Sequence, residues 1–308
     1  MKLATPRIAA SLGLVFLMLA GCAGESGPER PGPPVDPSGD IAMTAAQPFT
    51  AFPQEDVNTL NEIRRKLVYR CMAEAGFPAY RQENLAMPAR VSSLLNLERH
   101  IVGWASERHA RAQGFGSDAP PTPVEIVSFD AGHDKLLDGC VADAGARIGP
   151  KFKRTIDLAT DLANTLSAER VEVFDTAKYK ELNASVLACL SGKGFDADER
   201  TREDIGARPE AFGVKTGGLA EMSEPVLKRE PGTIEVIPAQ PARRYVPTAE
   251  EADLAAAMFT CQTETGALTD LRTLVNDAQR TAWTRHEDDL ANLKTDLTTL
   301  LKTATTLL

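Results

Sequence analysis

The sequence has few aromatic residues and few groups arranged for catalysis or metal binding. Aromatic residues make up 6% of the 308 positions, with two tryptophans and four tyrosines, so few rings are available to stack on sugars. None of the four histidines belongs to an HExxH motif, and no two cysteines have the C-x-x-C spacing of zinc or redox sites. The chain also lacks a GxSxG nucleophile elbow and a Walker-type phosphate loop. We therefore expect a non-enzymatic protein without catalytic residues, cofactor or metal.

Basic residues and long apolar runs are also scarce. The chain has 34 Lys and Arg against 43 Asp and Glu, a formal net charge of −9. Nucleic-acid binding requires a basic face, so nucleic acid is not an expected partner. After Cys22, every stretch of about 20 residues contains charges, so no later segment is expected to cross a bilayer.

The first residues have the pattern of an export signal. Lys2 and Arg7 precede an apolar run from Ile8 to Ala20, which is too short to span a bilayer. The run closes with Leu-Ala-Gly-Cys22, which resembles the lipobox of bacterial lipoproteins. That resemblance implies a signal peptide at residues 1–21, cleavage before Cys22, a diacylglyceryl group on its sulfur and an acyl chain such as palmitate on its amine. The alternative is an ordinary secretory signal that happens to end in Gly-Cys.

Lipidation at Cys22 predicts attachment to the cell membrane, on the side that faces away from the cytoplasm. Residues 22–53 are rich in Pro, Gly and Ser and lack apolar periodicity. We expect them to form a disordered tether that holds the body on the order of 30 Å from the lipid.

The remaining cysteines share a local pattern that divides the chain into two halves. Each is followed five residues later by glycine, as at Gly76, Gly145, Gly194 and Gly266. Glycine commonly ends a helix, so each cysteine is expected in the last full turn of one. Cys140 follows Cys71 by 69 residues, and Cys261 follows Cys189 by 72. This repetition predicts two related α-helical units, at residues 54–175 and 176–308, unless the recurrence is accidental.

Four cysteines in an exported protein favour two disulfides. Three connectivities are possible, and the sequence by itself does not choose among them. If each half was once an independent unit, Cys71 pairs with Cys140 and Cys189 pairs with Cys261.

The helices can be read from apolar spacing, and the fold class is mainly α. Residues 57–75 carry a three-to-four-residue stripe, and residues 151–191 form one long helix or two with a break near Phe174–Lys178. Thr248-Ala-Glu-Glu251 predicts a capping box. The last 40 residues predict a long, coiled-coil-like helix with one phase change near His286 and Leu290. The long stretches near residues 78–130 and 195–247 are expected to be irregular, with a helix possible over 94–113 and a short strand over 233–237.

A few polar residues are candidates for cation binding or catalysis. Asp130, His133 and Asp134 are compact enough to bind a cation, but before a helix such residues more often act as caps. The triplets at 98–100 and 107–109 both read Glu-Arg-His, and their nine-residue offset puts the histidines on opposite helix faces. We interpret Ser117 as a loop serine and His286, near Trp283, as a packing residue.

Several of these features recur together in one group of proteins. They are the lipobox with its Pro-rich tether, CMAEAGF at Cys71, CLSGKGF at Cys189, and TAEEADLAAAMFTCQTETG before a long charged helix. In these the chain resembles a group of uncharacterised actinobacterial lipoproteins, and the resemblance implies no particular activity.

Our leading hypothesis is a non-enzymatic, membrane-anchored envelope protein that binds an envelope partner through helical surfaces. The alternative is a small-ligand-binding lipoprotein that serves a transporter. A long exposed apolar stripe on the C-terminal helix would favour the first. A cleft between the halves with convergent polar groups would favour the second.

Overall fold

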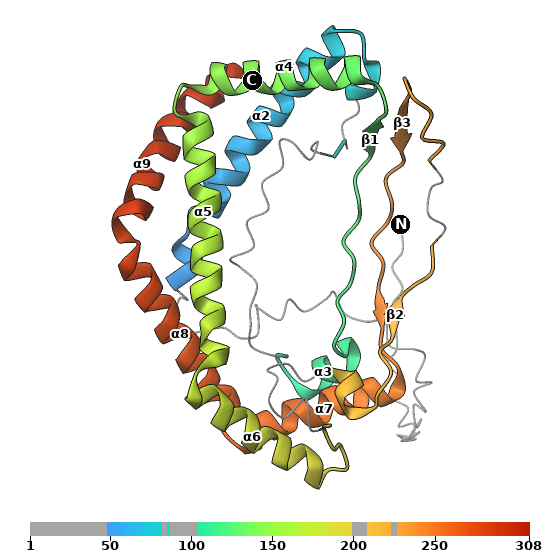
Figure 1. The fold of residues 1–308 in the computed structure, drawn as a ribbon, viewed down its shortest axis with the longest axis vertical. Helices are drawn as coiled ribbons and strands as arrows, with labels where there is room; N and C mark the ends of the chain where they lie inside the picture. The colour runs from blue at the N-terminus through green and yellow to red at the C-terminus, as the bar shows by residue number, and fades with distance from the viewer. Residues whose placement is uncertain (1–47, 82–84, 87–103, 199–207, 223–226) are drawn as a thin grey trace, which may run out of the picture. The chain divides into compact units, whose positions relative to one another are not determined.

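The structure, a computed structural model, describes residues 48–81, 85–86, 104–198, 208–222 and 227–308, all within one compact unit, Asp36–Leu308. The described residues form eight α-helices and four short strands, which confirms the mainly α fold class. The shortest helix is α3 (Glu107–Gln113). The longer ones are α2 (Gln54–Glu74), α4 (Ala131–Ile148), α5 (Phe152–Val171), α6 (Ala177–Gly192), α7 (Ala249–Glu264), α8 (Ala267–Arg285) and α9 (Glu287–Ala304) (Figure 1).

The larger hydrophobic core is built from α2, α4, α5 and α9. Helix α2 buries Val57, Leu60 and Leu67, which belong to the predicted stripe. Helix α9 buries the predicted C-terminal seam, which consists of Leu290, Leu293, Leu297, Leu300 and Ala304. This seam packs against α2, α4 and α5, so the C-terminal apolar stripe is covered by the chain itself.

A second core lies between α6 and α7. Its buried side chains are spaced three or four residues apart along each helix, and they include Leu182, Val186, Leu190, Leu254 and Met258. Phe115, which follows α3, and Ala267, the first residue of α8, also belong to this core. Thr176 and Thr248 begin α6 and α7 as N-caps, since each hydroxyl accepts a hydrogen bond from the backbone three residues on.

Neither core is made by one half of the sequence alone. Helix α9, from the second half, completes the first core, and α3, from the first half, packs against α7. The halves also share an antiparallel ribbon, in which β1 (Glu125–Ser128) pairs with β3 (Ile234–Ile237). A predicted boundary between residues 175 and 176 therefore does not separate two independent cores.

The ribbon lies in stretches that we expected to be irregular. Strand β3 matches the short strand predicted over 233–237, and β2 (Gly218–Leu219) pairs with β4 (Tyr245–Val246). Of the possible helix over 94–113, the described part is α3, and residues 94–103 lie outside the described residues.

Three of the four Cys-Gly motifs end a helix as predicted. Gly76, Gly194 and Gly266 follow α2, α6 and α7 with positive φ angles of 103°, 91° and 74°. The prediction is wrong at Gly145, because α4 continues to Ile148 and Cys140 lies well before its end. A Cβ atom at Gly145 would lie 3.2 Å from the Phe152 ring, so this glycine lets α4 and α5 approach closely.

The break considered near Phe174–Lys178 is present, and the predicted phase change near His286 is a break between two helices. Helix α5 ends at Val171, and one 3-10 turn, Glu172–Asp175, separates it from α6. The C-terminal helical segment is long, but it bends out of helical geometry at His286, where φ is −110° and ψ is 17°. That break explains the phase change between the apolar stripes of α8 and α9.

The folded body begins before the predicted end of the tether. Phe49 and Phe52 are 2% and 5% exposed and belong to the first core, and the backbone N–H of Phe49 faces Gln279 Oε1 at 3.4 Å. Residues 48–53 are therefore part of the body, which corrects the boundary at 53. The sequence does not predict burial of the two phenylalanines, because the segment is too short to show apolar periodicity.

Two disulfides connect the helices in the predicted pairs. Cys71 on α2 is bonded to Cys140 on α4, with Cα atoms 5.8 Å apart. Cys189 on α6 is bonded to Cys261 on α7, with Cα atoms 5.7 Å apart. Each bridge joins two helices of the same core.

Within the described ranges, no helix combines the length and apolar character needed to cross a membrane.

Candidate functional site

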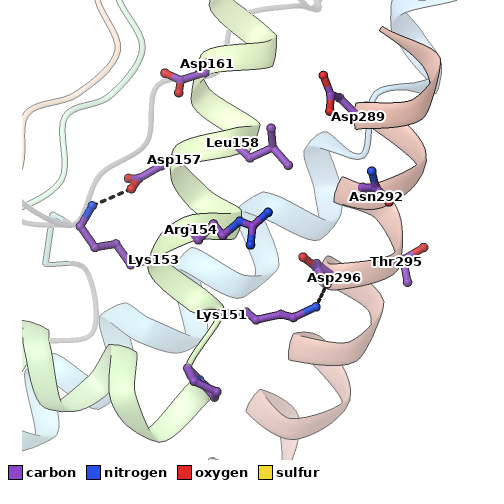
Figure 2. Close-up of a pocket in the computed structure, with 11 residues that line it drawn as sticks. Lys151, Lys153, Arg154, Asp157, Leu158, Asp161, Asp289, Asn292, Thr295 and Asp296 are labelled. Carbon is purple, nitrogen blue, oxygen red and sulfur yellow. Dashed lines mark hydrogen bonds and ion pairs between the residues drawn. The ribbon is translucent and has the colours of Figure 1, made fainter.

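A polar groove lies between α5 and α9, and we call it the α5–α9 groove (Figure 2). Its volume is about 820 Å³. From the α5 side it is lined by Pro150, Lys151, Lys153, Arg154, Asp157, Leu158 and Asp161, and from α9 by Asp289, Asn292, Thr295 and Asp296. The two sides come from the two halves of the sequence, so the groove brings polar groups of both halves together.

Part of the charge in the groove is paired. Lys153 Nζ lies 2.6 Å from Asp157 Oδ2, and Lys151 Nζ reaches across to Asp296 Oδ1 at 2.7 Å (Figure 2). Arg154 has no ion-pair partner among the described residues. An open groove with charges of both signs and one leucine suits a polar ligand or a polar protein surface better than an apolar one.

A smaller pocket, which we call the α6–α8 pocket, lies in the second core. It has a volume of about 190 Å³. Its lining comes from four parts of the chain and consists of Trp104, Phe115, Tyr179, Leu182, Asn183, Val186, Met258, Gln262, Ala267 and Leu271. No sequence pattern predicted this pocket, because its walls are contributed by segments up to 167 positions apart, from Trp104 to Leu271.

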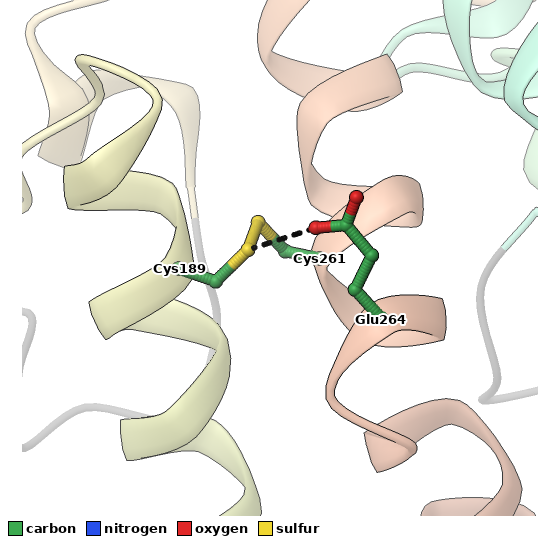
Figure 3. A group of neighbouring side chains, drawn as sticks. All are labelled: Cys189, Cys261 and Glu264. Carbon is green, nitrogen blue, oxygen red and sulfur yellow. Dashed lines mark hydrogen bonds between the residues drawn. A yellow bond between two sulfur atoms is a disulfide. The ribbon is translucent and has the colours of Figure 1, made fainter.

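Cys189, Cys261 and Glu264 form the group of potential metal ligands drawn in Figure 3. Their ligand atoms lie within 4.8 Å of one another, but the two sulfurs are joined at 2.04 Å. A disulfide sulfur lacks the negative charge that makes a thiolate a metal ligand. Glu264 instead lies 3.1 Å from Lys193 Nζ. In the oxidised protein this group is a structural bridge beside a surface ion pair.

Glu251 forms only half of the predicted capping box. Its backbone N–H donates to Thr248 Oγ1 at 3.1 Å, as expected. Its side chain does not reach back to the cap. It is fully buried and accepts hydrogen bonds from the backbone N–H of Phe115 at 2.7 Å and of Gly217 at 2.5 Å. The Tyr245 hydroxyl lies 3.0 Å from both carboxylate oxygens.

The environment of Glu251 explains two other features of the sequence. Gly217 belongs to a glycine-rich segment, Gly213-Val-Lys-Thr-Gly217-Gly218, whose spacing is not that of a phosphate loop. A Cβ atom at Gly217 would lie 1.9 Å from the carbonyl oxygen of Val246. Burial and the neighbouring Glu251 carboxylate raise the pKa of Tyr245 to about 12. The phenol therefore stays protonated and donates a hydrogen bond to the carboxylate. Glu251 therefore joins three segments of the chain to the start of α7.

The compact group at the start of α4 is structural. Asp130 is the N-cap, and its Oδ1 accepts from the backbone N–H of His133 at 2.6 Å. The His133 side chain is 2% exposed, with Nε2 3.0 Å from the Tyr80 hydroxyl and Nδ1 3.4 Å from Asp134 Oδ1. Burial raises the pKa of Tyr80 to about 12. These contacts match the capping interpretation and leave His133 with no open face toward a substrate.

The other predicted polar groups are not assembled into one site. The triplet at 98–100 lies outside the described residues, while Nδ1 of His109 accepts from the backbone N–H of Ala105 at 3.3 Å. Ser117 is exposed in its loop. In the described part of the chain, no histidine side chain is hydrogen-bonded to a serine or cysteine side chain.

His286 has a partner that the sequence did not reveal. Its Nε2 lies 2.9 Å from Glu169 Oε1, and Arg285 Nη1 lies 2.9 Å from Glu169 Oε2. Burial acts to raise the pKa of the Glu169 carboxyl, but the hydrogen bonds and charges of His286 and Arg285 outweigh it, so the pKa is lowered. The ion pairs fasten the break between α8 and α9 to the end of α5.

We expect Glu169→Gln to destabilise the protein by about 1 to 2 kcal/mol at pH 7, because hydrogen bonds to a charged group are lost. A carboxyl with a lowered pKa contributes stability above its unfolded pKa, and this contribution is lost as the pH falls through the folded value. The difference between variant and wild type should therefore shrink below the ordinary carboxyl pKa of 4.5. Urea unfolding at pH 7 and pH 3 measures it, with Glu172→Gln as the control on the same helix end. A constant difference at both pH values would contradict the role of the charge.

Cys22, the predicted lipid-attachment residue, lies outside the described residues.

Comparisons with protein-family models, with curated proteins and with solved structures found no match for this chain.

Proposed function

We propose that this protein is a membrane-anchored, extracytoplasmic lipoprotein that acts as a non-enzymatic interaction or accessory protein of the cell envelope. The observation that carries the proposal is the Leu-Ala-Gly-Cys22 motif behind a cationic and apolar leader. The two disulfides support it, because structural disulfides persist in oxidising compartments outside the cytoplasm. A relation to the actinobacterial lipoproteins that the chain resembles is part of this proposal.

The distance between lipid and body follows from where the body begins. Because Phe49 is packed in the first core, the predicted tether shortens to residues 22–47. A flexible chain of that length has an average reach of about 30 Å. The body would then act near the membrane surface rather than deep in the surrounding cell wall.

The surface for a partner is not the one that the sequence suggested. The apolar seam of α9 is buried against α2, α4 and α5 and is not free to bind another protein. The α5–α9 groove is the larger open feature, and its polar lining supports a charged or hydrogen-bonding envelope partner. The groove also combines polar groups from both halves of the sequence. This arrangement favours the second candidate function, a small-ligand-binding lipoprotein that serves a transporter.

Anchoring is tested first, by Cys22→Ser in the producing cell. We expect the wild type to incorporate an alkyne analogue of palmitate and the variant to lose this label. Without the Cys22 sulfur the diacylglyceryl group has no attachment point, and the cleavage that frees the amine for acylation does not follow. An uncleaved leader could keep the variant on the membrane, so a second form carries residues 23–308 behind an ordinary cleavable secretion signal. It should appear in the soluble fraction. The pair Cys189→Ser and Cys261→Ser is the control and should keep the label.

The same strains test the interaction. A photo-cross-linking residue at Asp161, in the groove, should give a protein adduct of defined mass that is absent for a cross-linker at Thr281, exposed on α8. The adduct should weaken in the Cys22→Ser strain, because anchoring raises the local concentration of partners. Retention of the label in Cys22→Ser would refute the anchor. Equal adducts at both positions would refute the groove as the partner surface, and a bound small molecule in native mass spectrometry would favour the second function.

A further inference from the structure

The α6–α8 pocket has the size of a site for one small ring. An apolar cavity of about 150 Å³ is known to hold benzene, so a pocket of about 190 Å³ has room for a ring with one small substituent. Two aromatic side chains form one wall, since Trp104 and Phe115 meet edge to face with their ring centroids 5.1 Å apart. The Trp104 Nε1–H already donates to the Gly114 carbonyl oxygen at 2.9 Å, so the indole offers the pocket an apolar surface.

Besides Tyr179, two carboxamides line this largely apolar pocket. Gln262 Oε1 is buried and has no hydrogen-bond partner, and among the described residues the Asn183 side chain has none either. A buried polar atom without a partner is unfavourable, so a ligand that donates a hydrogen bond to Gln262 Oε1 would relieve this penalty. The last torsion of a glutamine side chain is soft, so the carboxamide of Gln262 can rotate to meet a ligand.

The chemistry of the lining also selects the charge of a ligand. No acidic or basic residue lines the pocket. A charged molecule would lose its hydration without gaining an ion pair, whereas a neutral hydroxyl can donate to one carboxamide and accept from the other.

We propose that the α6–α8 pocket binds a neutral, single-ring molecule with one hydroxyl group, that is, a ligand of the phenol class. Its ring lies against Trp104 and Phe115, and its hydroxyl is held by Gln262 and Asn183. This site is distinct from the α5–α9 groove and does not depend on the proposed function.

The test uses residues 22–308 with both disulfides and with Cys22→Ser, so that no lipid or detergent competes for the probe. Trp283→Phe leaves Trp104 as the single tryptophan, and its fluorescence reports binding. The probes are p-cresol, toluene, which lacks the hydroxyl, and benzoate, which is charged. We expect p-cresol to bind about fivefold or more tightly than toluene, as one net hydrogen bond predicts, and benzoate not to bind.

The decisive variant combines Gln262→Met with Asn183→Leu, which keep similar volumes and remove both carboxamides. It should fold, because an unpaired buried oxygen is removed with Gln262, and it should bind toluene more tightly than p-cresol. Asn292→Leu in the α5–α9 groove is the control and should keep the wild-type order. Absence of p-cresol binding in the folded protein, or a preference for p-cresol that survives the double variant, would overturn the proposal.

Discussion

Glu251→Ala is expected to lower the free energy of unfolding by about 3 kcal/mol, because it removes the buried acceptor of three partly buried donors. These donors are the backbone N–H groups of Phe115 and Gly217 and the Tyr245 hydroxyl. Each belongs to a different segment of the chain, the last of them to β4, so the loss should also raise hydrogen exchange around residues 115 and 217. Urea unfolding followed by circular dichroism, together with exchange measured by mass spectrometry, tests both effects.

Glu250→Ala is a matched control for this variant. Glu250 precedes Glu251 in the first turn of α7, so both substitutions remove one negative charge near the helix N-terminus, but Glu250 is exposed. The control should change the stability by less than about 1 kcal/mol. Equal losses for the two variants would show that the helix charge matters and the buried hydrogen bonds do not.

Removal of the Cys189–Cys261 bridge, by Cys189→Ala with Cys261→Ala, is expected to lower the free energy of unfolding by up to about 4 kcal/mol. The bridge closes a loop of 72 residues, and a loop of this size restricts the unfolded chain by about that amount. The effect should be local, since both cysteines lie in the core between α6 and α7. Exchange should therefore rise in α6 and α7, while α2, α4, α5 and α9 keep their protection.

The reciprocal variant, Cys71→Ala with Cys140→Ala, should show the opposite pattern, with exchange rising in α2 and α4. Peptide mapping of the wild type without reduction should find the same two pairs. A fragment that links Cys71 to Cys189 or Cys261, or equal loss of protection in both cores, would contradict two separately stapled cores.

Helix positions were readable from the sequence because their signals act over a few residues. An apolar step of three or four residues, a threonine cap and a glycine with positive φ each depend on one turn of backbone, as Thr248 and Gly266 show. Gly145 carries the same pattern for another reason, since it makes room for Phe152 on the next helix. A local motif cannot distinguish a helix end from a close contact with another helix.

The pockets and Glu251 were hidden from the sequence for a related reason. Glu251 stands where a capping box expects glutamate, and its true acceptor role depends on residues 34 and 136 positions away. Likewise, the walls of the α6–α8 pocket become neighbours only after α6, α7 and α8 have packed.

By itself the sequence determined the mainly helical fold and the ends of most helices. The repeated cysteine spacing suggested the pairing of the disulfides only on the assumption of two related units, and the structure decided among the three connectivities. The sequence did not determine which helices share a core: α9 packs against α2 and α5, and α3 packs against α7, so the halves exchange elements. Apolar stripes are chemically alike, and any one can cover any other. The choice among them depends on side-chain shape, helix length and chain connection, which act together only in the tertiary structure.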